Sequence, residues 1–257
     1  MDLAAIATTE LNRFLLCLAR TSGLVVASPV FGGGLVPAPA RAFLAVLLAL
    51  SIFPLMPPVS PPATVLGYGG ALLAEVAVGL ALGLVTALVF AAVQLAGQLL
   101  DLSTGFGLSG VFDPVSSQSM PVLGHFLYLV MWAMLLATDG HHLILRALAE
   151  SYRRVPPGGA GLAAGAPVVL DLAGWMFATG LMLSLPVLAV LVAVMVALGL
   201  VSRAVPQFNV FITGLPVQVA VTLVALLAGL PALAAAMTGL VQPMGEALGR
   251  IVEAMAR

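Results

Sequence analysis

Long stretches of this sequence carry no charged residue, and they limit the chain to a few kinds of structure. Leu172 to Val201 is uncharged throughout, and so is Val210 to Pro243. A third stretch, Ala63 to Leu100, carries a single charge, that of Glu75. About 20 apolar residues in a helix are enough to cross the hydrocarbon core of a bilayer. These runs therefore predict helices in a membrane, or in an assembly that is equally apolar.

The composition leads to the same class of protein. Of the 257 residues, 62% are hydrophobic and 7% are charged, whereas a soluble domain has about 25% charged residues. So few charges cannot cover a surface in water, so we expect an all-α, polytopic integral membrane protein. No polar linker divides the chain, so we expect a single domain. The formal net charge of -1 argues against a nucleic-acid partner, which requires a basic patch.

The hydrophobic sequence divides into about six main helical units, separated by polar or proline-rich connections. These units are Leu11 to Val30, Ala42 to Met56, Ala63 to Leu100, Val122 to Thr138, Leu172 to Val201 and Val210 to Pro243. The second is short for a span of ~30 Å and the third is too long, so broken helices are expected. Because proline interrupts a helix, Pro186 should kink or split the fifth unit, and Pro216 and Pro231 should fold the sixth into a helical hairpin.

Two shorter segments mix apolar and charged residues. Asp139 to Pro157 carries Glu150, Arg153 and Arg154 among leucines, and Gly245 to Arg257 is similar. This mixing predicts amphipathic helices, which lie at an interface or pack beside other chains.

Glu75 is the most informative charge because it lies inside an apolar unit. A carboxylate buried there needs either a partner or a proton. The candidate partners are Arg20, Arg41 and Arg203. Structural pairing and a role in proton relay both remain open on the sequence.

Glycines in the same unit carry a second prediction. Gly79 and Gly83 are four residues apart, the small-xxx-small spacing of closely packed membrane helices. A further group near the beginning of the unit is expected to delay the start of the helix, namely Gly67, Gly69 and Gly70.

The longest polar, glycine-rich interruption in the first half of the chain is Asp101 to Pro121. Lipid cannot satisfy free backbone groups, so such a loop must be buried in protein or line a water-filled space. Its glycines allow tight turns, and its exposed apolar residues need something to contact. We therefore predict a gate that seals an aqueous path, with these residues as its working part: Phe106, Gly107, Gly110, Val111, Phe112 and Met120.

The sequence predicts no catalytic, cofactor-binding or metal-binding residues. The histidines are His125, His141 and His142, and the adjacent pair would point about 100° apart on a helix, which makes a shared metal difficult. There is no CxxC or HExxH pattern, and a Walker loop is excluded because the chain has no lysine.

Two other functions stay open on the residues alone. Gly107-Leu108-Ser109-Gly110 matches the short GxSG pattern of rhomboid intramembrane proteases, in which Ser109 would be the nucleophile. Alternatively, the chain could be a proton-coupled transporter in which Glu75 carries the proton. The first predicts that Ser109→Ala abolishes function, and the second that Glu75→Gln abolishes transport.

Blocks along nearly the whole chain resemble the FliR family of flagellar biosynthetic proteins, whose virulence counterparts serve type III secretion injectisomes. The most specific block is Arg203-Ala204-Val205-Pro206-Gln207-Phe208-Asn209-Val210-Phe211 followed by Gly214-Leu215-Pro216. The others are Arg20 to Leu24 with Ser28 to Phe31, Glu75 with Gly79, Gly97 to Asp101, Gly105 to Pro114, and Asp139-Gly140-His141-His142 with Ser151-Tyr152. The adjacent histidines and Arg203 favour the flagellar branch.

The resemblance implies a non-enzymatic subunit of a helical export gate in the bacterial inner membrane, multi-pass and located at the flagellar basal body. Its partners would be FliP-like, FliQ-like and FlhB-like subunits, and unfolded flagellar proteins would pass through. Residues 1–200 would form a FliP-like part, and residues 201–257 a FliQ-like hairpin and tail. The family's pore plug maps to about Gly105 to Pro121, while Glu75 and Arg203 would make structural contacts in the assembly.

Overall fold

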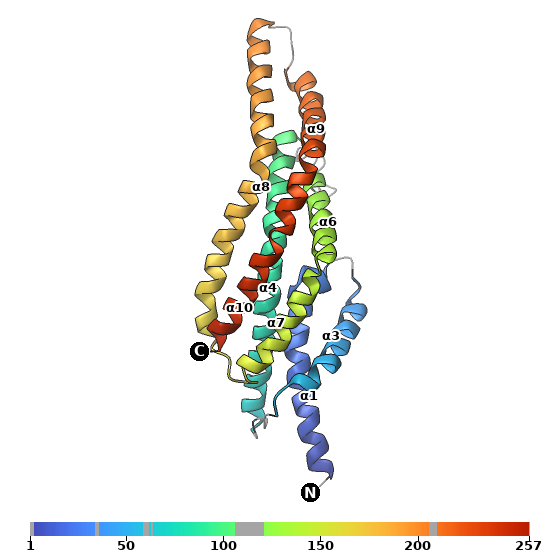
Figure 1. Ribbon diagram of the computed structural model, residues 1–257, viewed down its shortest axis with the longest axis vertical. Coiled ribbons are helices and arrows are strands. Elements are labelled where there is room, and N and C mark those ends of the chain that lie inside the picture. The colour runs from blue at the N-terminus through green and yellow to red at the C-terminus, as the bar shows by residue number, and fades with distance from the viewer. Residues whose placement is uncertain are drawn as a thin grey trace. The chain divides into compact units, whose positions relative to one another are not determined.

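The computed structural model describes residues 3–33, 36–58, 62, 64–105, 121–205 and 210–256 (Figure 1). Every regular element among these residues is a helix. In chain order they are α1 (Leu3–Ala27), α2 (Pro29–Gly32), α3 (Ala38–Ile52), the 3-10 helix η1 (Phe53–Leu55), α4 (Val65–Thr104), α6 (Val122–Ala137), α7 (Gly140–Arg154), α8 (Leu162–Ala204), α9 (Val210–Thr238) and α10 (Val241–Met255).

The lengths and composition of these helices confirm an all-α, polytopic membrane protein. In the described part of the chain, four helical stretches are long and apolar enough to cross a membrane, or five if α6 and α7 form one span. The four are Ala38–Leu55, Val65–Thr104, Leu162–Ala204 and Thr213–Met255. With 40 residues, α4 is about 60 Å long, roughly twice the thickness of a bilayer core.

Each predicted hydrophobic unit contains one principal helix, but two expectations about where helices break or begin were wrong. Val210 to Pro243 does not form a hairpin, because α9 continues through Pro216 and Pro231 to Thr238. Pro186 was expected to kink or split its helix, and α8 is not split there. The glycines expected to delay α4 lie inside it, since α4 begins at Val65. In apolar surroundings a helix satisfies its own backbone groups, which outweighs the local cost of glycine and proline.

The helices form two compact units, and the first comprises Met1–Val89, Asp139–Gly174 and Val241–Arg257. Within it α1 packs against α3, and α7 packs against α10. The inner faces of α7 and α10 are apolar, with Ile144 and Leu148 facing inward on α7 and Leu248 and Ile251 on α10, all with no exposed surface. Both segments predicted to be amphipathic helices are therefore confirmed.

The second unit comprises Phe90–Thr138 and Trp175–Leu240. Here α6 packs against α9. The later part of α8 approaches α4 closely at Gly180, where an added Cβ would lie 2.7 Å from the carbonyl oxygen of Ala92. Small residues thus allow close backbone packing in this unit as well.

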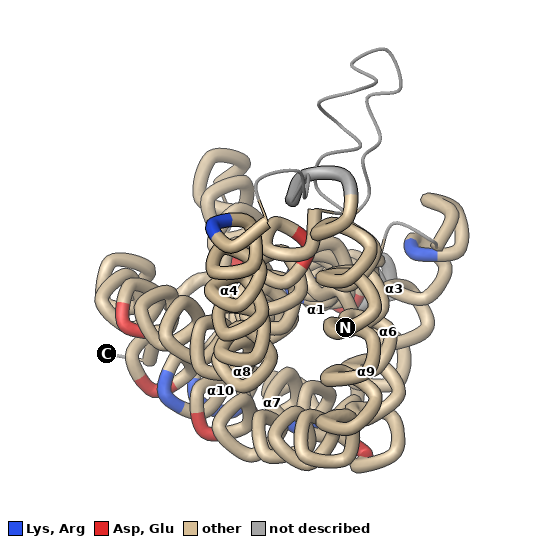
Figure 2. Tube along the Cα trace, turned by 90° about the horizontal axis from the view of Figure 1, so that it is seen from above, with Lys and Arg blue, Asp and Glu red and all other residues tan. Residues whose placement is uncertain are grey.

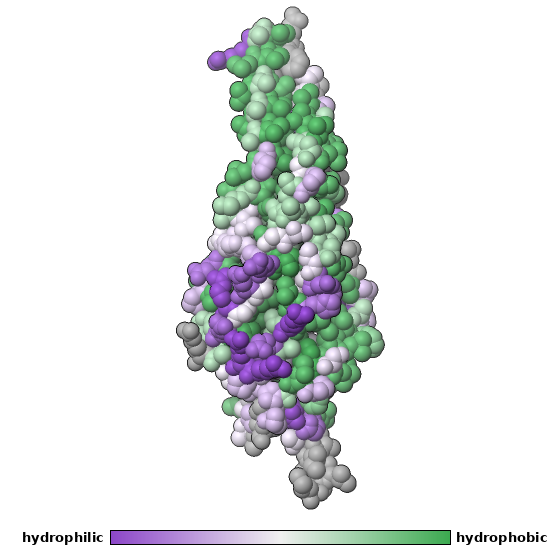
Figure 3. Space-filling model, in the orientation of Figure 1, coloured by the Kyte–Doolittle hydropathy of each residue, from purple (hydrophilic) through white to green (hydrophobic). Residues whose placement is uncertain are grey.

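Charged residues are sparse along the helices, as the tube view shows (Figure 2). On the face drawn in Figure 3, hydrophilic side chains gather over α7 and α10, whereas apolar side chains predominate over the later part of α8 and over α9. In the hydrophilic group, Arg154 contacts Glu150 at 2.9 Å and Glu253 at 2.8 Å. The hydrogen bond from Arg154 lowers the pKa of the Glu150 carboxyl.

Candidate functional site

A buried ion pair joins α1 to α4. Arg20 Nε donates to Glu75 Oε2 at 2.7 Å, and Arg20 Nη2 donates to Glu75 Oε1 at 3.0 Å. Neither side chain has any exposed surface. Two parallel hydrogen bonds between a guanidinium and a carboxylate fix direction as well as distance, so this pair sets how the two helices meet.

The remaining polar atoms of the pair are satisfied by the chain around α7. Arg20 Nη1 donates to Ser151 Oγ, and Arg20 Nη2 donates to the carbonyl oxygen of Val155, both at 3.0 Å. The backbone N–H of Gly158 donates to Glu75 Oε1 at 3.0 Å. A buried charge is tolerated only when its hydrogen bonds are made, and here one network joins three separate parts of the sequence.

Tyr152 completes the surroundings of the guanidinium. Its ring lies 4.3 Å from Arg20 Cζ, within the range of a cation–π contact. Its hydroxyl donates to the carbonyl oxygen of Cys17 at 2.9 Å. A single helix, α7, thus supplies both a hydroxyl and an aromatic face to Arg20, which sequence reasoning did not predict.

Of the three arginines that could pair with Glu75, Arg20 is the one that does so in the structure. Arg41 Nη1 instead makes a long hydrogen bond of 3.4 Å to the carbonyl oxygen of Gly32. Arg203 is exposed at the end of α8 and has no ion pair with the residues that the structure describes. Arg20 and Glu75 are 55 residues apart, so their pairing depends on the tertiary fold and could not be chosen from the sequence.

Beside the ion pair, α1 and α4 touch through their backbones. An added Cβ on Gly79 would overlap the carbonyl oxygen of Arg20, and one on Gly23 would lie 2.5 Å from the carbonyl oxygen of Val76. An added Cβ on Gly83 would lie 2.5 Å from Ala27 Cβ. The close contact predicted from Gly79 and Gly83 is confirmed, and its partner is α1.

The predicted gate residues lie outside the part of the chain that the structure describes, as does Ser109. They are Phe106, Gly107, Gly110, Val111, Phe112 and Met120. The structure does describe the two helix ends between which they lie, at Gly105 and Pro121.

Those two helix ends are tied together by Asp101. Its carboxylate accepts hydrogen bonds from the backbone N–H of Leu123 at 3.0 Å and of Gly124 at 2.9 Å. These N–H groups belong to the first turn of α6, whose cap residue, Pro121, supplies no side-chain bond. Nearby, an added Cβ on Gly97 would overlap Gly124. A carboxylate from α4 thus caps α6, a role that the sequence did not reveal.

We expect Asp101→Ala to lower the free energy of unfolding by about 1–2 kcal/mol, because two buried N–H groups lose their acceptor. Asp101→Asn keeps one acceptor oxygen and should cost less. The melting temperature of the solubilised chain measures both effects, and Asp171→Ala, at an exposed position, serves as the control. If Asp101→Ala and Asp171→Ala have the same melting temperature, Asp101 does not stabilise the chain by capping α6.

A cavity of about 120 Å³ lies next to this junction, lined by Gln94, Gln98, Pro121, Gly124 and His125. Sites for drug-sized ligands usually span about 300–1,000 Å³. The cavity has room for a few water molecules, which Gln94, Gln98 and His125 could bind, so it does not indicate a small-molecule substrate.

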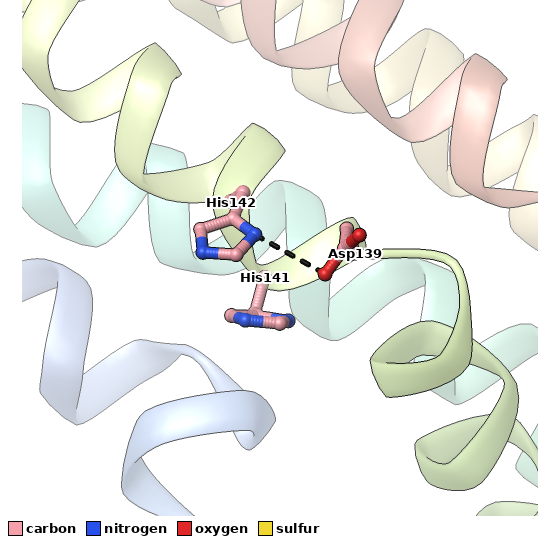
Figure 4. Close-up of side chains that lie close together, drawn as sticks. All are labelled: Asp139, His141 and His142. Carbon is pink, nitrogen blue, oxygen red and sulfur yellow. Dashed lines mark ion pairs between the residues drawn. The ribbon is translucent and has the colours of Figure 1, made fainter.

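The junction before α7 brings three possible metal ligands together (Figure 4). Asp139 Oδ1 lies 3.3 Å from His142 Nδ1, and the rings of His141 and His142 are 4.1 Å apart at their centroids. One ligand atom from each of the three residues lies within 4.8 Å of the others. The adjacent histidines, which were expected to share a metal only with difficulty, thus have ligand atoms close to each other and to Asp139.

The long apolar helices and their buried polar network define a polytopic helical membrane protein. The sequence model of the bacterial export proteins, family 1, matches residues 11–244. The chain therefore belongs to this family, the FliR family of flagellar biosynthetic proteins, as its sequence motifs indicated.

Named relatives agree with this membership. Flagellar biosynthetic protein FliR of Bacillus subtilis (strain 168) is 36% identical over 220 residues, which cover 83% of this chain and 84% of the relative. FliR of Escherichia coli (strain K12) is 31% identical, with 87% and 86% covered. Secretion system apparatus protein SsaT of Salmonella typhimurium is 28% identical, with 72% and 74% covered.

Proposed function

We propose that this chain is a structural and gating component of a flagellar type III protein export apparatus and helps to assemble the flagellum. The observation that carries this proposal is the family match over residues 11–244. The flagellar relatives are named for biosynthesis and SsaT for a secretion apparatus. These names support the role of a structural subunit in an apparatus and not that of an enzyme. Its location would be the bacterial inner membrane at the flagellar basal body.

The proposed partners are FliP-like, FliQ-like and FlhB-like subunits. Large apolar side chains at helix surfaces support an assembly: Val65 is 92% exposed, Leu66 89% and Leu170 73%. Lipid or neighbouring subunits must cover such surfaces. The FliP-like part (1–200) and the FliQ-like part (201–257) also remain a proposal, and their boundary falls in the last turns of α8.

The segment between α4 and α6 is the proposed gate for unfolded flagellar substrates. Phe106, Val111 and Phe112 would close the path, with Gly107 and Gly110 as joints and Met120 near the far end. The carboxylate of Asp101 supports this proposal because it holds together the helix ends from which the segment emerges. Glu75 and Arg203 would be structural, the first within the chain and the second toward another subunit.

Co-expression with FliP-like and FliQ-like subunits, followed by native mass spectrometry, tests the proposed membership of the gate. We expect one copy of this chain in a complex of several subunits. A lone monomer or homodimer, with both candidate partners folded and present, would contradict the proposal.

The same purified complex tests the gate. After reconstitution into vesicles, deletion of Gly107 to Phe112 should raise ion leakage, because the apolar seal is lost. Ser109→Ala is the matched control in the same segment, and we expect unchanged leakage and unchanged export. Tight vesicles with the deletion variant would exclude a plug, whereas loss of export in Ser109→Ala would favour the protease alternative.

A further inference from the structure

We propose that Asp139, His141 and His142 form a binding site for a divalent transition-metal ion such as Zn²⁺. Two imidazoles and one carboxylate are ligands that Zn²⁺ accepts, whereas Mg²⁺ and Ca²⁺ prefer oxygen. The three side chains come from one short stretch at the beginning of α7, so no distant part of the chain is needed to build the site (Figure 4).

The spacing of the ligand atoms fits a metal of this size. Bonds of about 2.1 Å to a tetrahedral Zn²⁺ place neighbouring ligand atoms roughly 3.4 Å apart. Asp139 Oδ1 and His142 Nδ1 are already 3.3 Å apart, and the whole set lies within 4.8 Å. The ligand atoms therefore need to approach one another by no more than about 1.4 Å to hold one ion.

The surroundings of His141 favour metal binding, because one of its ring nitrogens is buried and unpaired in the described part of the chain. Its Nδ1 is buried and has no hydrogen-bond partner among the described residues. A buried polar nitrogen without a partner is costly, and coordination would satisfy it. The other two groups are accessible from solvent, with 56% of the His142 side chain and 76% of the Asp139 side chain exposed, so an ion can enter.

The backbone at Asp139 brings the carboxylate to the histidines. Asp139 has φ 56°, a left-handed conformation that aspartate tolerates better than most residues, and its side chain does not cap α7. Its negative charge offsets the partial positive charge of the helix N-terminus, which would otherwise oppose a cation. Three protein ligands leave one position of a tetrahedral ion for water or another ligand.

Zinc titration of the full-length chain tests the site. The protein is prepared in detergent without a histidine tag, and Zn²⁺ is partitioned between it and a colorimetric chelator. We expect one Zn²⁺ per chain, and H141A/H142A should weaken binding by at least about tenfold, as losing even an outer partner of a metal site can. Excess Mg²⁺ should not compete.

His125→Ala is the matched control, because it removes the remaining histidine in the other unit of the chain. It should bind Zn²⁺ like the wild type, while Asp139→Asn should bind more weakly. Unchanged helicity and elution volume verify that each variant is folded. Equal zinc binding by the wild type and H141A/H142A would overturn the proposal and leave Asp139 and His142 as neighbours that contact each other without a metal.

Discussion

Glu75→Ala is expected to lower the free energy of unfolding by about 3–5 kcal/mol, because it leaves the Arg20 charge buried without a partner. Arg20 has no exposed surface through which water could replace the lost carboxylate. In a chain of this size, the loss corresponds to a fall in melting temperature on the order of 10 °C. Circular dichroism of the detergent-solubilised chain during heating measures it.

The double variant Arg20→Met/Glu75→Leu separates the charge from the packing. It removes both charges and fills the space with apolar side chains. Its melting temperature should therefore be closer to that of the wild type than the melting temperature of Arg20→Met alone or of Glu75→Leu alone. Arg154→Ala is the control, because Arg154 pairs at the surface and should change melting little. If the stability losses of Arg20→Met and Glu75→Leu simply add in the double variant, the two side chains do not interact as the structure indicates.

The same double variant decides between a structural and a proton-carrying Glu75. Three N–H groups donate to this carboxylate, from Arg20 Nε, Arg20 Nη2 and Gly158, so both of its oxygen atoms are already engaged in structural hydrogen bonds. We therefore expect the double variant to support flagellar export in a strain lacking its own copy, although position 75 no longer carries a carboxyl group. Complete loss of export from a normally folded and assembled double variant would favour the proton-coupled transporter.

Hydrophobic runs predicted where helices form, because an apolar backbone must satisfy its own hydrogen bonds. Val122 to Thr138 became α6 almost without change. The runs did not predict where helices break. Pro216 and Pro231 predict a helical hairpin, yet α9 passes through both. The hydrogen bond that a proline removes costs less than exposing the backbone of a whole turn to an apolar environment.

Partners across the fold were the least predictable part of the site. The sequence showed that Glu75 needs a partner, but only packing brings in Arg20 and then Ser151, 131 residues from Arg20. Likewise, the spacing of Gly79 and Gly83 predicted a close contact and could not name α1. Local patterns indicate that a group must be satisfied, whereas the tertiary arrangement determines by which atoms.

Gly79→Ala is expected to destabilise the chain by an amount near the upper end of the range of about 1–3 kcal/mol that overpacking costs. The added methyl group would overlap the carbonyl oxygen of Arg20, a backbone atom that cannot turn aside. The two helices would have to separate, which also stretches the ion pair beside them. Thermal melting measures the loss, which should be smaller in the Arg20→Met/Glu75→Leu background, where no ion pair remains to be stretched.

Gly70→Ala provides a control on the same helix, since an added Cβ there meets nothing within 4 Å. An alanine in a helix is more favourable than a glycine by up to about 1 kcal/mol, so this variant should melt at or slightly above the wild-type temperature. The same substitution is thus expected to have opposite signs at two positions of α4. If Gly79→Ala also melts at or above the wild-type temperature, α1 and α4 do not meet backbone to backbone, and the geometry that holds Arg20 against Glu75 would have to be different.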